Sequence, residues 1–91
     1  MLRITTHTDD LAVTLQMEGR LAGSAVHEAE RCWQALRVEY SDWALRVDLR
    51  AVTFIDQEGI ALLKQVFREG AGFLSSGCLT NAYVEEVTGS G

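Results

Sequence analysis

Hydrophobic and polar residues alternate with a period of two in several parts of the chain. The alternation covers residues 2–5, 11–18 and 45–50. The mainly apolar residues 52–55 are expected to continue the last of these strands. Such alternation is typical of strands with one buried face. Thr8-Asp9-Asp10 favour a turn between the first two segments, so we expect a β-hairpin whose second strand starts at Leu11. Phe73-Leu74 predict a further short strand.

Two other segments have helical spacing. Apolar residues recur at three-four intervals between 26 and 40 and again between 60 and 67, where Phe67 belongs to the apolar stripe. Ser24 is the expected N-cap of the first helix, and Gly70 is placed to end the second. Residues 80–87 predict a last helix. The order β-β-α-β-α-β-α indicates an α/β fold, a mixed sheet with helices packed on it.

The acid-Gln-acid-Gly segment from Asp56 to Gly59 lies where the strand ending at Ile55 meets the second helix. Helix capping is one interpretation: Asp56 accepts a bond from a first-turn N–H, and Glu58 complements the positive end of the helix dipole. The same helix start is also exposed to a partner. Residues two apart on a helix point to different sides, and no nucleophile arrangement is visible nearby. We therefore expect no catalytic residues and no enzyme.

The residues from Val47 to Leu63 resemble the signature of STAS domains, the fold of anti-sigma-factor antagonists and of the cytosolic tails of some anion transporters. The family pattern is a hydrophobic strand with an Asp-Leu pair, a short apolar stretch, then Asp-Ser/Thr-Ser-Gly and a Leu-rich helix. The corresponding residues are Asp48-Leu49, Val52-Thr53-Phe54-Ile55, Asp56, Gly59 and residues 60–63. The resemblance implies a STAS-like mixed β-sheet and a non-catalytic protein-interaction module for signal transduction and transcription regulation.

One position departs from the family pattern. The second residue after the aspartate is the phosphoacceptor serine or threonine in regulatory members, and Glu58 occupies it here, preceded by Gln57. Neither side chain accepts phosphate. We therefore expect no phosphoswitch and a domain that stays in one binding state. Glu58 is a partial mimic, with one negative charge where phosphoserine carries about 1.5 to 2.

The resemblance also implies a partner and a surface. Relatives bind kinase-like anti-sigma factors and thereby free a sigma factor. We expect the docking surface to combine the connector from Arg20 to Ser24 with the start of the second helix, that is Arg20, Gly23, Ser24, Asp56, Gln57, Glu58 and Gly59. Two alternatives stay open: an accessory subunit of a membrane transporter or lipid-trafficking ATPase, and a small-ligand or nucleotide sensor. No cofactor is expected.

Composition and charge limit the classes of partner that the chain can bind. The chain has 91 residues, a net charge of −5 and no cluster of Lys and Arg, which disfavours nucleic acid and anionic membranes as partners. We expect a single domain over residues 1–88, a flexible tail at 89–91, and a bacterial, cytoplasmic protein that does not insert into a membrane. A homodimer is expected at moderate concentration.

The cysteines and histidines do not predict a metal site. Cys32 and Cys78 have no metal-ligand spacing, and we expect both to be reduced thiols; His7 and His27 do not provide enough ligands for a metal ion.

Overall fold

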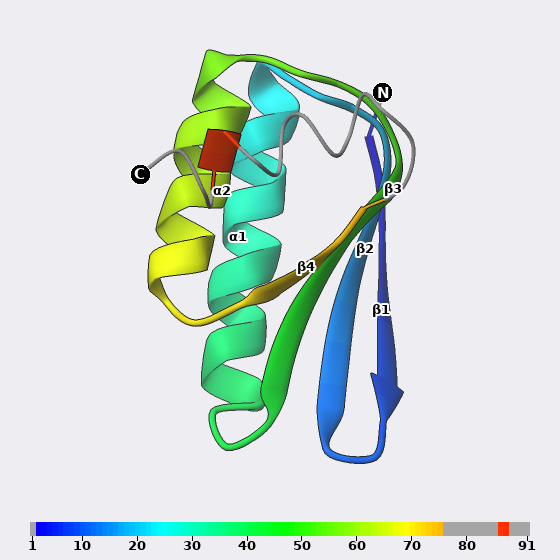
Figure 1. Ribbon diagram of the computed structural model, residues 1–91, viewed down its shortest axis with the longest axis vertical. Helices are drawn as coiled ribbons and strands as arrows, with labels where there is room; N and C mark the ends of the chain where they lie inside the picture. Colours follow the sequence, from blue (N-terminus) through cyan, green and yellow to red (C-terminus); the bar gives the residue numbers. More distant parts are fainter. Residues whose placement is uncertain (1, 76–85, 88–91) are drawn as a thin grey trace.

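The computed structural model describes residues 2–75 and 86–87, which form a four-stranded mixed sheet with two helices on one face (Figure 1). The strand order is β1-β2-β3-β4; β1 and β2 are antiparallel, and β2-β3 and β3-β4 are parallel. The elements are β1 (Leu2–Asp9), β2 (Ala12–Leu21), α1 (Ser24–Glu39), β3 (Ala44–Ile55), α2 (Gln57–Arg68) and β4 (Gly72–Leu74).

This architecture confirms the predicted α/β class and the element order as far as β4. Residues 86–87 are helical, and the rest of the predicted last helix lies outside the described residues. So do Cys78 and the tail at 89–91. Within the described residues, neither long helix is both long and apolar enough to cross a bilayer.

The hairpin between β1 and β2 closes more tightly than the sequence indicated. Asp9 pairs with Ala12, and the two residues between them have positive φ angles, 43° at Asp10 and 64° at Leu11. This is the two-residue turn whose twist matches that of the flanking strands. The prediction that Leu11 belongs to the buried strand pattern is wrong, because Leu11 lies in the turn and is 69% exposed.

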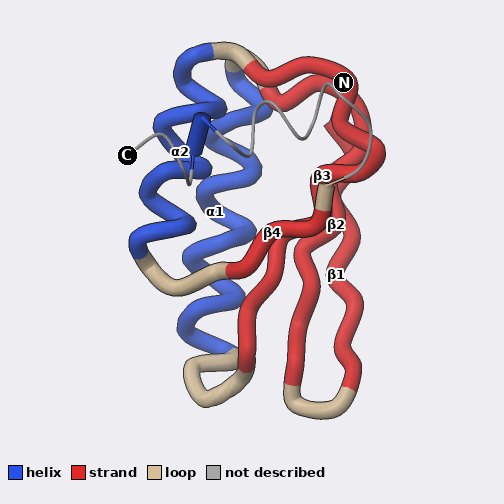
Figure 2. The backbone as a smooth tube through the Cα atoms, in the orientation of Figure 1, coloured by secondary structure: helices blue, strands red, loops and turns tan. Residues whose placement is uncertain are grey.

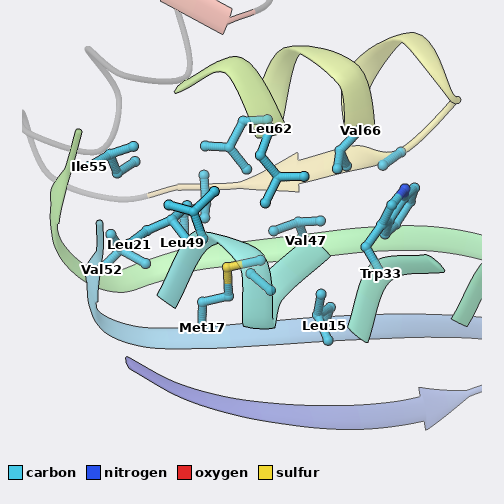
Figure 3. Packing of buried hydrophobic residues seen from close by; sticks show 14 of the residues in the cluster. Leu15, Met17, Leu21, Trp33, Val47, Leu49, Val52, Ile55, Leu62 and Val66 are labelled. Carbon is cyan, nitrogen blue, oxygen red and sulfur yellow. The ribbon is translucent and has the colours of Figure 1, made fainter. Parts of the chain in front are cut away.

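The core lies between the helices and the sheet. Figure 3 shows side chains of α1 and α2 meeting those of β2 and β3, with Trp33 of α1 at one end, only 1% exposed. The helical residues expected inside are buried, namely Val26, Ala29, Trp33, Leu36, Ile60, Leu63 and Val66. Phe67 is an exception at 42% exposed; its ring stacks on Phe73, with centroids 6.2 Å apart. Each fully buried aliphatic side chain stabilises the fold by about 1.5–3 kcal/mol.

Polar contacts fix the helices to each other at the C-terminal end of α2. Glu69 accepts a hydrogen bond of 2.6 Å from the Trp33 indole N–H, and its other oxygen lies 3.3 Å from an Arg37 nitrogen. The indole N–H is thereby satisfied although the ring is buried, as a buried polar group requires. Gly70 follows with φ 103°, which confirms it as the glycine that ends α2.

The start of α1 differs from the expectation, whereas the predicted cap of α2 is confirmed (Figure 2). The N-cap of α1 is Gly23, with φ 60° and ψ −134°, and no side chain caps this helix. The prediction of Ser24 as N-cap is therefore wrong; Ser24 is the first helical residue. Helix α2 begins at Gln57, and Asp56 is its N-cap, as predicted.

Gly59 lets α2 start directly against the sheet. A Cβ atom built on it lies 2.7 Å from Ile55 Cγ2 and 2.7 Å from the Leu21 carbonyl oxygen. Such distances are too short for non-bonded atoms, so the helix comes closer to β2 and β3 than any larger residue permits. The close approach seats the first turn of α2 on the ends of both strands.

We expect Gly59→Ala to lower the free energy of unfolding by about 1–3 kcal/mol, the cost of overpacking a filled site. Alanine normally stabilises a helical position, so the sign of the change reports the clash. Urea unfolding measures it. Gly72→Ala is the matched control, since its nearest atom, Arg46 Cγ, lies at an ordinary 3.7 Å. A Gly59→Ala protein as stable as the wild type contradicts the close approach.

Candidate functional site

The candidate site lies where the parallel strands β2 and β3 end and the two helices begin (Figures 1 and 2). The last residues of the two strands, Leu21 and Ile55, are paired, and the Asp56 N–H donates to the Leu21 carbonyl at 3.2 Å. The connector after β2 and the start of α2 are therefore neighbours, although about 35 residues separate them in the sequence. Ligands of open α/β sheets commonly bind at this end of the strands.

The Asp56 carboxylate joins the two segments. Its Oδ1 accepts a hydrogen bond of 2.8 Å from the Gly59 N–H, and its Oδ2 accepts one of 2.9 Å from the Gly23 N–H. One side chain thus caps α2 and also holds the residue that precedes α1. Gly23 presents its N–H from the left-handed region of φ, which favours glycine at this position.

These bonds also set the charge state of the site. Hydrogen bonds from the backbone N–H groups of Gly23 and then Gly59 hold the pKa of Asp56 below its ordinary value. Donors that face the ionised form stabilise it relative to the neutral acid. Asp56 is therefore a structural anion, and each of its two oxygens already accepts one backbone N–H.

Glu58 differs from Asp56 in this respect. It is exposed in the first turn of α2, and among the described residues it forms no ion pair. It borders a hollow of about 240 Å³ between α1 and α2, lined by Val26, His27, Glu30, Glu58, Ala61, Leu62 and Gln65. Gln57 beside it is exposed as well. The residues free to meet a partner at this helix start are thus Gln57 and Glu58.

The predicted connector from Arg20 to Ser24 needs correction. Arg20 and Leu21 belong to β2, because their pairing with β3 continues to the last residue of that strand. Arg20 is exposed and its guanidinium carbon lies 4.5 Å from the centroid of the Phe54 ring. This cation–π contact holds a positive charge at the end of the sheet that carries Asp56.

The structure brings the predicted site residues to one end of the molecule and adds others. Phe54, His27 and Glu30 were not predicted as site residues. Phe54 lies under Arg20, while His27 and Glu30 line the hollow beside Glu58. The pairing of Arg20 with Phe54 depends on register shifts in β2-β3, one of them between Gly19 and Arg20, and nothing in the sequence pattern indicates those shifts.

A second polar cluster lies in the sheet. Asp48 lies at a polar position of the alternation over residues 45–50, yet it is only 5% exposed, and Arg50 forms two side-chain hydrogen bonds to it of 3.0 and 2.9 Å. The hydrogen bonds from Arg50 lower the pKa of Asp48, and burial opposes them. The pair is structural and lies outside the candidate site.

Comparisons with known proteins agree on the fold. No family profile and no curated protein sequence matches the chain. Among solved structures, an anti-sigma factor antagonist from Mycobacterium paratuberculosis is 20% identical, with a TM-score of 0.83 over 98% of this chain and 79% of that one. Unphosphorylated SpoIIAA, another anti-sigma factor antagonist, is 14% identical, with a TM-score of 0.62 over 96% and 99%. The chain has a STAS-like fold.

The chain is also similar to the solved structure of Mglu, at 15% identity and a TM-score of 0.61, over 81% of this chain but only 19% of that one.

The STAS-like arrangement confirms the resemblance drawn from residues 47–63. In this structure Asp56 caps α2, Glu58 is the exposed second residue of that helix, and Gly59 lies directly against the ends of β2 and β3.

The two lowered pKa values predict how stability depends on pH. A carboxylate whose pKa is lower in the folded protein stabilises it above the unfolded pKa of about 3.9, and this contribution is lost as pH falls through the folded pKa. We expect the urea midpoint to fall below about pH 4 through Asp48 and Asp56.

Urea titrations between pH 2.5 and 7 measure this effect. Asp48→Asn and Asp56→Asn each keep a hydrogen-bond acceptor but remove one ionisation, so the acid-side slope of either variant is shallower. The control Asp42→Asn removes an exposed carboxylate outside both clusters and retains the slope of the wild type. Equal slopes in all four proteins contradict the prediction.

Proposed function

We propose that the chain is a non-catalytic protein-docking module of the anti-sigma-factor-antagonist type. Its partner is a protein, a kinase-like anti-sigma factor, which contacts the end of the sheet defined by Arg20, Gly23, Ser24 and Asp56 to Gly59. The observation that carries this proposal is the Asp56 bridge, which fixes two segments as one surface. The STAS-like fold shared with two anti-sigma factor antagonists supports the same assignment.

The surface has the character of a docking site more than of an active site. The Asp56 oxygens accept backbone N–H groups, whereas Gln57 and Glu58 face outwards beside a shallow hollow. Arg20 adds a positive charge nearby, so the surface carries both signs in fixed places. Such a pattern selects a partner by complementary charge and fixes its orientation.

Glu58 gives this surface a permanent charge where the resemblance implies a switchable hydroxyl. We infer that the partner has adapted to it and places an Arg or Lys opposite the carboxylate. Glu58 is unpaired among the described residues, so this contact requires no internal ion pair to break. A charge-assisted hydrogen bond of this kind contributes about 1.5–3 kcal/mol. Binding is then constitutive, and no kinase acts on this helix start.

The test uses the full chain as bait in its native host, with mass spectrometry to identify captured proteins and calorimetry on the purified pair. We expect an anti-sigma factor, bound at least about tenfold more weakly by Glu58→Gln and Glu58→Ser, the equivalent of about 1.4 kcal/mol. Glu39→Gln, at the opposite end of α1, removes the same charge and leaves the affinity unchanged.

Four outcomes go against parts of this proposal. Stronger binding by both Glu58 variants means that the charge holds the partner off. Unchanged affinity in both reduces Glu58 to a residue that stabilises the helix dipole. A transporter or ATPase subunit as the specific partner transfers the assignment to the alternative function. Phosphate found anywhere from Asp56 to Gly59 in the wild-type protein rules out the fixed state.

A further inference from the structure

The outer edge of β1 is an open template for another strand. Strand β1 is at one edge of the sheet and is eight residues long, while β4 at the other edge has three. Its pairing with β2 is continuous, without a bulge, and it contains neither proline nor lysine. Natural edge strands are commonly protected by such features. Within the described residues, no strand pairs with this edge.

The hairpin turn determines which backbone groups are available. Asp9 and Ala12 close the two-residue turn and therefore exchange hydrogen bonds. Because hydrogen-bonding direction alternates along a strand, the odd-numbered residues of β1 face β2 and the even-numbered residues point outwards. Among the described residues, the N–H and C=O groups that point away from the sheet are thus those of Leu2, Ile4, Thr6 and Thr8. An antiparallel strand from a second copy pairs with them when both partners use even-numbered residues.

Several antiparallel registers pair even-numbered residues of both copies, and they differ in which residue of β1 lies on the two-fold axis between the copies. The charges on β1 favour one of these registers. With Thr5 on the two-fold axis, Arg3 lies opposite His7 of the second copy; with Ile4 on the axis, it lies opposite Thr5. With Thr6 on the axis, Arg3 lies opposite Asp9 of the second copy, and the symmetry repeats the pair. Opposite charges directly across two strands stabilise their pairing. This register forms about six backbone hydrogen bonds between the copies.

The same register brings an exposed leucine near a groove beside β1. The groove, of about 770 Å³, lies between β1 and α1, and its lining combines the half-buried Leu2, Ile4, Ala25 and Cys32 with the polar Ser24, His27, Glu28 and Arg31. Leu11 in the hairpin turn is 69% exposed. Placing Thr6 on the axis sets Asp10 of each copy opposite Leu2 of the other, so the adjoining Leu11 reaches the end of that groove.

We propose that two copies of this chain associate through antiparallel pairing of their β1 strands, with Thr6 on the two-fold axis. The backbone groups, the Arg3–Asp9 pairs and the Leu11 contact come from one surface and are self-complementary, as an isologous dimer requires. The proposal specifies a surface for the expected homodimer and does not depend on the partner site around Asp56.

Sedimentation equilibrium of the full chain at about 0.15 M salt tests the proposal. We expect the wild type to dimerise below about 500 µM, and Arg3→Asp and Asp9→Arg each to raise Kd by roughly tenfold through two like-charge contacts. The double variant, Arg3→Asp with Asp9→Arg, restores Kd to within about threefold of the wild type. Lys64→Asp changes net charge by the same amount as Arg3→Asp, but on the exposed face of α2, and shifts Kd by less than about threefold.

A second pair of variants tests the apolar contact. Leu11→Ser raises the dimer Kd by about fivefold, whereas Val38→Ser, an equally apolar residue 82% exposed on α1, leaves it unchanged. Circular dichroism and thermal unfolding confirm that each variant is folded. A wild type that is monomeric throughout, a double variant as weak as either single one, or a Lys64→Asp protein as weak as Arg3→Asp overturns the proposal.

Discussion

The carboxylate of Asp56 is the interaction on which the candidate site depends. It accepts from Gly59 inside α2 and from Gly23 just before α1, so one ionised group specifies where both helices leave the sheet. A cap that served α2 alone would leave the connector after β2 to find its own position. Here the bonds that hold the two segments together also stabilise the ionised carboxylate, and they lower the pKa of Asp56.

A second constraint lies beside that bridge, where the backbone of α2 comes very close to the sheet at Gly59. The missing side chain lets the first turn of α2 rest on the Leu21 carbonyl and on Ile55. Glycine is therefore needed here for space, whereas at Gly23 it is needed for its positive φ, since no atom lies within 4 Å of a Cβ placed there. Two glycines serve one site for different physical reasons.

Sequence reasoning predicted the parts of the fold that depend on periodicity. The alternation in β2 and the stripe containing Val26, Ala29, Trp33 and Leu36 identified the core, and Gly70 identified the end of α2. It missed features that depend on local geometry. Leu11 continues the apolar alternation, yet it lies in the two-residue turn and not in β2. Ser24 is a residue type that commonly caps helices, yet Gly23 occupies the N-cap position.

The candidate site was likewise predictable only where it depends on residues that are close in the sequence. The motif from Asp56 to Gly59 is contiguous, so its cap was foreseeable. That Gly23 donates to Asp56 was not, because the contact depends on the pairing of Leu21 with Ile55 across parallel strands. Asp48 shows the converse limit: its alternating position indicated exposure, but Arg50 two residues later folds back over it and makes it a buried ion.

Glu58 and the β1 edge place the two proposed contacts on different elements. The docking surface around Asp56 is built from side chains at the ends of strands and helices, where specificity comes from charge and shape. The edge of β1 offers mainly backbone groups, which any strand satisfies, so its specificity must come from the charges and the register that flank them. At the start of α2, Gln57 and Glu58 carry no hydroxyl group, so under the proposed function the charge at this helix start is fixed by the sequence, whereas the pairing at the β1 edge depends on the concentration of the chain.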